Sequence, residues 1–385
     1  MPKGKLVLKD GHEFPGEIFG AEKPSTGEIV FSTGMVGYPE SLTDPSFHGQ
    51  ILTYTFPLIG NYGIPDEEKE HELSKVFESE KIHISGLVCS EYSQEHSHWR
   101  SHQSLSQKLK EAGIPGISGI DTRALTKILR TKGCMPAKIV PEKLDTGFTD
   151  TAAKNLVADV SPNSISYYPA QISSTKKQNK TIIVIDCGVK NNTLHNFLNR
   201  GVNLIRIPWN FDFHNPDNLI GTNLKSQKIP IDPKALHILQ SKSYDGIFLS
   251  NGPGDPALLT PTINIIKKTL PTGKPIFGIC LGNQLLGIAA GATTYKLKFG
   301  HRAQNQPCIN TENGKCYMTS QNHGYAIKRE SLPKNWKIWF ENANDKTIEG
   351  IKHQTLPLMA VQFHPEACPG PLDTEFLFDQ FISNL

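Results

Sequence analysis

Residues 275–284 read Pro-Ile-Phe-Gly-Ile-Cys-Leu-Gly-Asn-Gln. The apolar run 276–279 predicts a short buried strand, and the small, apolar pattern of 284–290 predicts a helix. Cys280 therefore stands where a strand turns into a helix, between glycines that leave room for an outward-pointing side chain. The positive end of the helix dipole favours the anionic form of such a thiol. The position predicts a reactive cysteine, although a free cysteine that only packs as a small hydrophobe has the same local pattern.

The segments around this stretch alternate between strand and helix patterns throughout 181–385. This alternation predicts an open, mostly parallel α/β sheet with right-handed crossovers. Antiparallel strands are expected within 293–365, and an amphipathic helix over 373–384 closes the chain. The expected strands of the parallel part are 181–186, 202–207, 246–250 and 276–279, and its expected helices are 192–200, 234–240, 262–270 and 284–290.

The first 160 residues follow a different pattern, which predicts a β-rich α+β domain. Asp121 is the expected N-cap of a helix that stops at Gly133. The Ser-, Pro-, Gln- and Lys-rich segment 161–180 is the expected linker between the two domains. Short alternating runs lie at 5–8, 17–19, 28–31 and 50–55, and polar helices are expected at 66–80 and 101–112.

Composition excludes several function classes. With 40 basic and 37 acidic residues, the net charge of +3 is too small to indicate nucleic-acid binding. The seven cysteines form no CxxC pair, so neither a zinc site nor a disulfide framework is predicted. Residues 1–8 lack the pattern of a signal or transit peptide. The most apolar run, 275–292, is broken by polar residues and glycines, which argues against a membrane span. We therefore expect a cytoplasmic protein without a bound metal.

Two further motifs are expected beside Cys280. The strand at 247–250 ends in Asn-Gly-Pro-Gly-Asp, 251–255, and the strand at 358–363 ends in His364-Pro-Glu366. Ligands of open α/β sheets bind beyond the carboxyl ends of the strands, so all three motifs belong to one rim. This set suits acyl transfer. His364 would take and return the thiol proton, and Glu366 would orient the imidazole.

The same rim also offers donors for an oxyanion. The backbone N–H groups of Leu281 and Gly252 are the expected pair, and one such donor contributes about 2.7–4 kcal/mol in comparable sites.

Each motif has an ordinary structural interpretation when it is taken alone. His-Pro-Glu and Asn-Gly-Pro-Gly-Asp are both common turn sequences, and no Gly-Lys-Ser/Thr follows to make a P-loop. His323 is a competing candidate for the base, but no carboxylate follows it to fix its tautomer. Glu95, His98 and His102 have the spacing of metal ligands on a helix, yet their polar surroundings favour a solvated helix start.

Together the motifs resemble the class I glutamine amidotransferase family, through the segments 278–284, 251–255 and 364–366. The first 150 residues resemble the N-terminal domain of the carbamoyl-phosphate synthetase small chain, which is the more specific match. The segments that carry this second resemblance are 32–38, 43–46, 59–63 and 120–123.

The resemblance implies a glutaminase subunit. It would hydrolyse L-glutamine through a Cys280 thioester and pass ammonia to a separate large subunit, which makes carbamoyl phosphate from ammonia, bicarbonate and ATP. No cofactor is expected in this chain, and ATP and Mg²⁺ would bind to the partner in a cytoplasmic heterodimer serving arginine or pyrimidine biosynthesis. The rivals are a free-standing hydrolase or cysteine peptidase and a catalytically silent regulatory chain.

The resemblance also implies a set of glutamine-binding residues. Hydroxyl, amide and backbone groups suit the α-amino and α-carboxylate groups of the substrate. Asn283 and Tyr325 stand where the family more often has His and Phe, and 210–233 is longer than the corresponding family segment, which suggests a surface insertion. The implied residues are Ser46, Gly252, Gly254, Leu281, Gln284, Asn322, Gly324 and Tyr325.

Overall fold

The computed structural model describes residues 1–151, 153–170, 180–219 and 229–385. These residues divide into two compact units. Unit 1 holds the β-rich first part of the chain, together with a short segment from the second half. Unit 2 holds the strand–helix alternation. The bounds are Met1–Leu156 and Leu297–Gln304 for unit 1, and Val157–Lys296 and Asn305–Leu385 for unit 2.

Unit 1 is built on a closed barrel in the strand order β1-β13-β3-β4-β9-β12-β2. β3, β4, β9 and β12 pair in parallel, and the other neighbours pair antiparallel. Apolar side chains such as Leu6, Ile29 and Ile139 fill a buried core, which explains the alternating sequence pattern. The bounds are β1 Lys3–Leu8, β2 Glu13–Gly20, β3 Ser25–Ser32, β4 Gln50–Tyr54, β9 Gly86–Val88, β12 Pro115–Ser118 and β13 Met135–Pro141.

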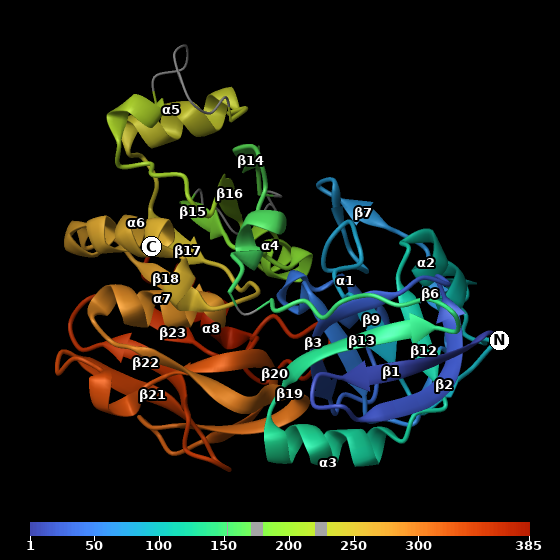
Figure 1. Cartoon of the computed structure of the whole chain (residues 1–385). Coiled ribbons are helices and arrows are strands. Elements are labelled where there is room, and N and C mark those ends of the chain that lie inside the picture. Colours follow the sequence, from blue (N-terminus) through green and yellow to red (C-terminus); the bar gives the residue numbers. More distant parts are fainter. Residues whose placement is uncertain (152, 171–179, 220–228) are drawn as a thin grey trace. The chain divides into compact units, whose positions relative to one another are not determined.

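Three helices and several short strands complete this unit (Figure 1). The expected cap is present, because the carboxylate of Asp121 accepts a hydrogen bond from the N–H of Ala124 at 2.8 Å and α3 ends at Gly133. The bounds are α1 Tyr38–Thr43, α2 Leu105–Glu111 and α3 Thr122–Lys132, with the short strands β5 Leu58–Ile59, β6 Ile64–Pro65, β7 Lys69–Glu70, β8 Leu73–Ser74, β10 Glu91–Tyr92 and β11 Ser101–Gln103.

The prediction of a helix at 66–80 is wrong. His71 and Glu72 have positive φ angles, which a right-handed helix excludes. The hydroxyl of Ser74 then accepts hydrogen bonds from the N–H groups of Val76 and Phe77, so a local turn replaces the helix. The helix expected at 101–112 is shorter than predicted, because Ser104 caps it and residues 101–103 form β11.

Unit 2 is organised around a ten-stranded sheet in the order β14-β16-β15-β17-β18-β23-β22-β21-β19-β20. The central strands β16, β15, β17, β18 and β23 are parallel, whereas β14 and the pairs β23–β22, β22–β21 and β21–β19 are antiparallel. The predicted α/β sheet is therefore present. The bounds are β14 Ser166–Tyr168, β15 Lys180–Asp186, β16 Val202–Pro208, β17 Gly246–Leu249, β18 Ile276–Ile279, β19 Thr294–Asn310, β20 Cys316–Ile327, β21 Trp336–Asn342, β22 Ile348–His353 and β23 Leu358–Val361.

Five helices of unit 2 pack against this sheet through buried apolar side chains. Figure 1 shows β18 and α7 following one another directly in the orange part of the chain. The central strands are buried on both faces, as their continuous apolar sequences predict. The bounds are α4 Asn191–Leu198, α5 Pro233–Ser241, α6 Thr260–Thr269, α7 Leu281–Ala290 and α8 Phe376–Ile382.

Two expected surface segments are described in part. Within the expected linker, Ser166–Tyr168 form β14 at the edge of the sheet, and 171–179 lie outside the described residues. Within the expected insertion, Pro216–Leu219 form a 3₁₀ turn, and 220–228 lie outside the described residues. None of the described helices is both long and apolar enough to cross a lipid bilayer.

Candidate active site

Cys280 occupies a strained turn between β18 and α7. It is the N-cap of α7, with φ 54° and ψ −104°, a conformation that costs a non-glycine residue about 1–3 kcal/mol. The turn is possible because a Cβ atom on Gly282 would stand 2.2 Å from the carbonyl oxygen of Leu249. Gly282, two residues after the cysteine, therefore lets α7 start directly against β17. The unfavourable backbone conformation is found at Cys280 itself.

The three motifs meet at one edge of the sheet. β17, β18 and β23 are parallel neighbours, with Leu249 paired to Gly278 and Ile279 paired to Val361. Their carboxyl ends therefore lead into the glycine turn, Cys280 and His364 at the same rim, as the sequence predicts.

His364 and Glu366 form a buried, hydrogen-bonded pair. Nδ1 of His364 lies 2.6 Å from Oε1 of Glu366, and both side chains are almost fully buried. Burial raises the pKa of Glu366, but the charges of Lys190 and His364 outweigh it and lower the pKa to about 2. The carboxylate is therefore ionised and accepts the hydrogen bond, which places the proton on Nδ1.

The thiol lies near the imidazole as well, and Nε2 of His364 is buried without a hydrogen-bond partner among the described residues. Burial lowers the pKa of His364, whereas the negative charge of Glu366, together with the nearby Cys280, raises it to about 10. The Cys280 thiol also donates to the backbone carbonyl of Asn322, with Sγ and O 3.6 Å apart. Sulfur, imidazole and carboxylate thus lie close together inside unit 2, and the imidazole and the carboxylate are joined by a hydrogen bond.

Lys190 is a member of this cluster that the sequence analysis missed. Its buried Nζ lies 3.3 Å from Oε1 of Glu366 and donates to the carbonyl of Ala367. The sequence could have indicated Lys190, because it lies four residues after the carboxyl end of the expected strand 181–186. That position belongs to the same rim as the three motifs. A buried carboxylate beside an imidazole requires such a counter-charge.

The glycine turn packs directly against the start of α7. A Cβ atom on Gly252 would meet the carbonyl oxygen of Cys187 at 2.1 Å and Cδ2 of Leu281 at 2.9 Å. Leu281 is the first residue of α7, so the helix offers its N–H no acceptor. The two residues predicted to bind an oxyanion are therefore neighbours, and their role stays a prediction.

Four further residues of the predicted glutamine site lie on α7 and β20, namely Gln284, Asn322, Gly324 and Tyr325. The side-chain amide of Gln284 donates to the carbonyl of Tyr325 at 2.8 Å and to Oε1 of Gln362 at 3.1 Å. Asn283 donates to the same Gln362 oxygen at 3.2 Å. Gln362, which the sequence analysis did not select, thus joins the two side chains.

Asn322, Gly324 and Tyr325 lie within β20, one of the strands expected within 293–365. Gly254 lies in the glycine turn with a φ of 88°. Ser46 belongs to unit 1, where its N–H donates to Asp44 at 2.8 Å, so its part in the glutamine site stays a prediction.

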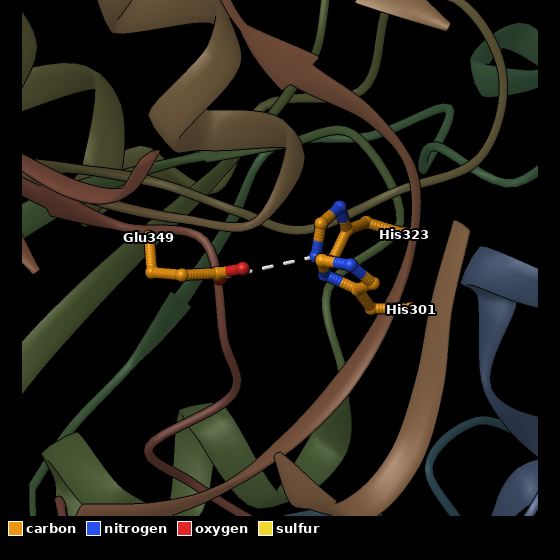
Figure 2. Close-up of side chains that lie close together, drawn as sticks. All are labelled: His301, His323 and Glu349. Carbon is orange, nitrogen blue, oxygen red and sulfur yellow. Dashed lines mark ion pairs between the residues drawn. The ribbon is translucent and has the colours of Figure 1, made fainter. Parts of the chain in front are cut away.

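His323 is engaged away from the thiol. Its Nδ1 lies 2.9 Å from the carbonyl oxygen of Tyr325, and its Nε2 lies 3.1 Å from Oε1 of Gln321. Figure 2 shows His323 beside Glu349, with an ion-pair distance of 3.9 Å. His301, which Figure 2 also labels, comes from the segment of β19 that belongs to unit 1. With both ring nitrogens of His323 occupied, His364 is the better candidate base.

The prediction of a helix start around His98 is wrong. Residues 93–100 form bends and turns rather than a helix, so the i, i+4 spacing of His98 and His102 has no helical face. Nδ1 of His102 lies 2.9 Å from Oδ1 of Asp66, and both side chains are exposed.

Comparison with protein families agrees with this geometry. Residues 183–384, more than half of the chain, match the model of glutamine amidotransferase class-I, and residues 6–139 match the model of the carbamoyl-phosphate synthase small chain, CPSase domain. The arginine-specific small chain of carbamoyl phosphate synthase from Debaryomyces hansenii is 44% identical over 396 residues, covering 100% of this chain and 86% of that protein. This chain belongs to the carbamoyl-phosphate synthase small-chain family.

Other relatives of this small-chain family are much longer proteins. Multifunctional protein pyr1-3 of Dictyostelium discoideum is 47% identical over 397 residues, covering 100% of this chain and 17% of that protein. The human mitochondrial carbamoyl-phosphate synthase [ammonia] is 43% identical over 383 residues, covering 98% of this chain and 23% of that protein. The chain therefore spans less than a quarter of the length of these two relatives.

Proposed function

We propose that this chain hydrolyses glutamine and supplies ammonia for carbamoyl phosphate synthesis. The observation that carries the proposal is the buried, hydrogen-bonded pair of His364 and Glu366, which lies near Cys280 at the carboxyl edge of the sheet. Membership of the small-chain family specifies the substrate, which the geometry alone does not.

The first half of the proposed reaction forms a thioester. The raised pKa of His364 favours a state in which the proton of the Cys280 thiol already resides on the imidazole, and the sulfur attacks the side-chain amide carbon of glutamine as a thiolate. The N–H groups of Leu281 and Gly252 stabilise the negative oxygen of the tetrahedral intermediate. The C–N bond then breaks, and His364 returns its proton to the departing nitrogen, which leaves as ammonia.

The second half releases glutamate. Water attacks the thioester carbon, His364 takes a proton from that water, and the C–S bond breaks to give glutamate and the free thiol. Glu366 keeps the imidazolium favourable at both stages, consistent with the raised pKa of His364. Lys190 balances the Glu366 charge.

The substrate residues remain part of the proposal. The residues proposed to hold glutamine are Gly252, Gly254, Leu281, Gln284, Asn322, Gly324 and Tyr325, and Ser46 remains a further proposed residue. Ammonia would pass to the large subunit of a heterodimer, the part that binds ATP and Mg²⁺. We propose a cytoplasmic location and a role in arginine or pyrimidine biosynthesis, which agrees with the name of the Debaryomyces relative for arginine.

Replacing the nucleophile tests the proposal. Cys280→Ser should abolish glutamine-dependent carbamoyl phosphate synthesis in the assembled complex and leave ammonia-dependent synthesis unchanged. Cys316→Ser is the matched control, because Cys316 is exposed, and it should retain both activities. Glutamate release by Cys280→Ser at the wild-type rate would show that the nucleophile is misassigned.

The name of the human relative specifies ammonia. It therefore favours one alternative, a chain that does not hydrolyse glutamine. The intact Cys280, His364 and Glu366 argue against it here. A glutamine-like alkylating reagent distinguishes the two, because a working glutaminase should be labelled at buried Cys280, and a silent chain should be labelled only at exposed Cys316.

A further inference from the structure

The loop that carries Lys190 is fixed by a buried ion pair that lies outside the triad. The carboxylate of Asp186, at the end of β15, is fully buried. Its Oδ1 accepts hydrogen bonds from the N–H groups of Gly188 and Val189, each at 2.7 Å. Its Oδ2 accepts from Nε of Arg206 on β16 at 2.5 Å. One carboxylate therefore holds the loop with one oxygen and the sheet with the other.

This loop, residues 187–190, contacts both sides of the proposed reaction centre. The carbonyl of Cys187 packs against Gly252, and the N–H of Cys187 donates to the Ser250 hydroxyl at 2.8 Å. Three residues after Cys187, the N–H of Lys190 donates to Oδ1 of Asn251 at 3.4 Å, and its Nζ lies 3.3 Å from Oε1 of Glu366. A shift of the loop would therefore displace the glycine turn and the counter-charge of Glu366 together.

The positive charge of Arg206 allows Asp186 to stay ionised in the core and to hold the 187–190 loop. A buried carboxylate without a counter-charge is unfavourable by several kcal/mol, so it takes up a proton or draws in water. Either response weakens its hold on the N–H groups of Gly188 and Val189. Burial lowers the pKa of Arg206, but Asp186 and Tyr168 on β14 raise it above its ordinary value, so the guanidinium is charged.

We propose that Arg206 is a positioning residue for the triad, acting through Asp186 and the 187–190 loop on Lys190 and Glu366. It touches neither the thiol nor the proposed substrate. The proposal rests on the proposed glutaminase function for its kinetic readout, and a second readout, the reactivity of Cys280, is independent of that function.

The kinetic test compares Arg206→Met with wild type in the full chain. Glutamine hydrolysis should lose at least tenfold in kcat, because the loop positions both the counter-charge of Glu366 and the glycine turn at Gly252. The acidic limb of the kcat profile should move to higher pH, since a displaced Lys190 no longer depresses the pKa of Glu366. Arg206→Lys, which keeps the charge, should recover part of both losses.

The control is Arg329→Met, which removes an arginine from the exposed ion pair with Glu341 in the same unit. It should leave kcat and the pH profile unchanged. A merely structural role for Arg206 predicts lower thermal stability in Arg206→Met with an unaltered pH profile, and that result would overturn the proposal. If Arg206→Met does not fold, Asp186→Asn should give the same acidic shift, because an amide cannot pair with Arg206 as an anion.

The second readout is the pH dependence of Cys280 alkylation by iodoacetamide, followed by peptide mass spectrometry. Its acidic limb should also move to higher pH in Arg206→Met and not in Arg329→Met. This shift in a chain without glutamine turnover would support the positioning role and refute the proposed function. Normal turnover with identical alkylation profiles in all three proteins would refute the positioning role alone.

Discussion

At the scale of single residues, the cluster depends on a sequence of opposite charges. Lys190, Glu366 and His364 alternate in sign when the imidazole is protonated, and all three are buried. Each charge is tolerated because its neighbour compensates it, which is how a protein holds an imidazolium beside a sulfur. The removal of any one member should therefore alter the others.

Replacing the carboxylate isolates its contribution to the proposed reaction. Glu366→Gln keeps the shape of the side chain and removes the charge that favours the imidazolium. We expect kcat for glutamine hydrolysis to fall by about 10⁴-fold, as in triads whose carboxylate becomes an amide. Steady-state kinetics provides the measurement. A kcat within tenfold of wild type would mean that Glu366 does not orient a catalytic His364.

The raised pKa of His364 predicts how stability varies with pH. The pKa is about 10 in the folded chain against an ordinary value of 6.5. The protonated ring therefore contributes stability that is complete below pH 6.5 and is lost as the pH rises toward 10. Glu366, with a pKa of about 2, stays ionised throughout this window.

Urea unfolding of wild type and His364→Gln across this window measures the effect. The wild-type advantage in free energy of unfolding should shrink steadily as the pH rises from 6.5 to 10. An advantage that stays constant or grows would show that His364 is buried in its neutral form.

At the scale of elements, the direct passage from β18 to α7 is decided by close backbone contacts. Gly282 lies so near the carbonyl of Leu249 that no side chain fits without moving α7 away from β17. The geometry of the cysteine turn is therefore a property of helix and strand packing and not of Cys280 alone.

A single methyl group tests this packing. Gly282→Ala should lower the free energy of unfolding by about 1–3 kcal/mol, the usual cost of overpacking, and should also reduce the alkylation rate of Cys280. The matched control is Gly147→Ala, where a new Cβ has no neighbour within 4 Å. Equal stability of the two variants in urea titrations would contradict the packing argument.

The elements also show where sequence patterns are sufficient and where they fail. Continuous apolar strands such as β15 and β18 were predictable because a strand that is buried on both faces has an uninterrupted run of apolar residues. The segment 66–80 was not, because its charges fit a helix, whereas His71 and Glu72 form the two-residue turn of the β7–β8 hairpin with positive φ angles. Lys190 was missed because a lysine after a strand is usually solvated, and its burial depends on Glu366, 176 positions later.

At the scale of the whole molecule, the proposed chemistry releases ammonia, which would be diluted if it escaped into the solvent. Ammonia released at Cys280 is useful only if the synthetase receives it before it equilibrates with solvent. The proposed function includes a larger partner for this step and therefore a protected transfer of ammonia between the two.

Isotope competition measures this transfer. The complex would be given glutamine labelled with nitrogen-15 in the side-chain amide, together with an excess of unlabelled ammonia. The carbamoyl phosphate should carry the label well above its share of the total ammonia pool. A label content equal to that share would mean that the ammonia passes through bulk solvent.

The central claim is that Cys280 forms a covalent intermediate with glutamine. Wild-type chain mixed with glutamine, quenched rapidly in acid and digested, should yield the Cys280 peptide with the added mass of a glutamyl thioester. His364→Gln, which should acylate slowly, provides a comparison. A glutamyl group on any other residue, or turnover of glutamine with an unmodified Cys280 peptide at every time point, would contradict the account.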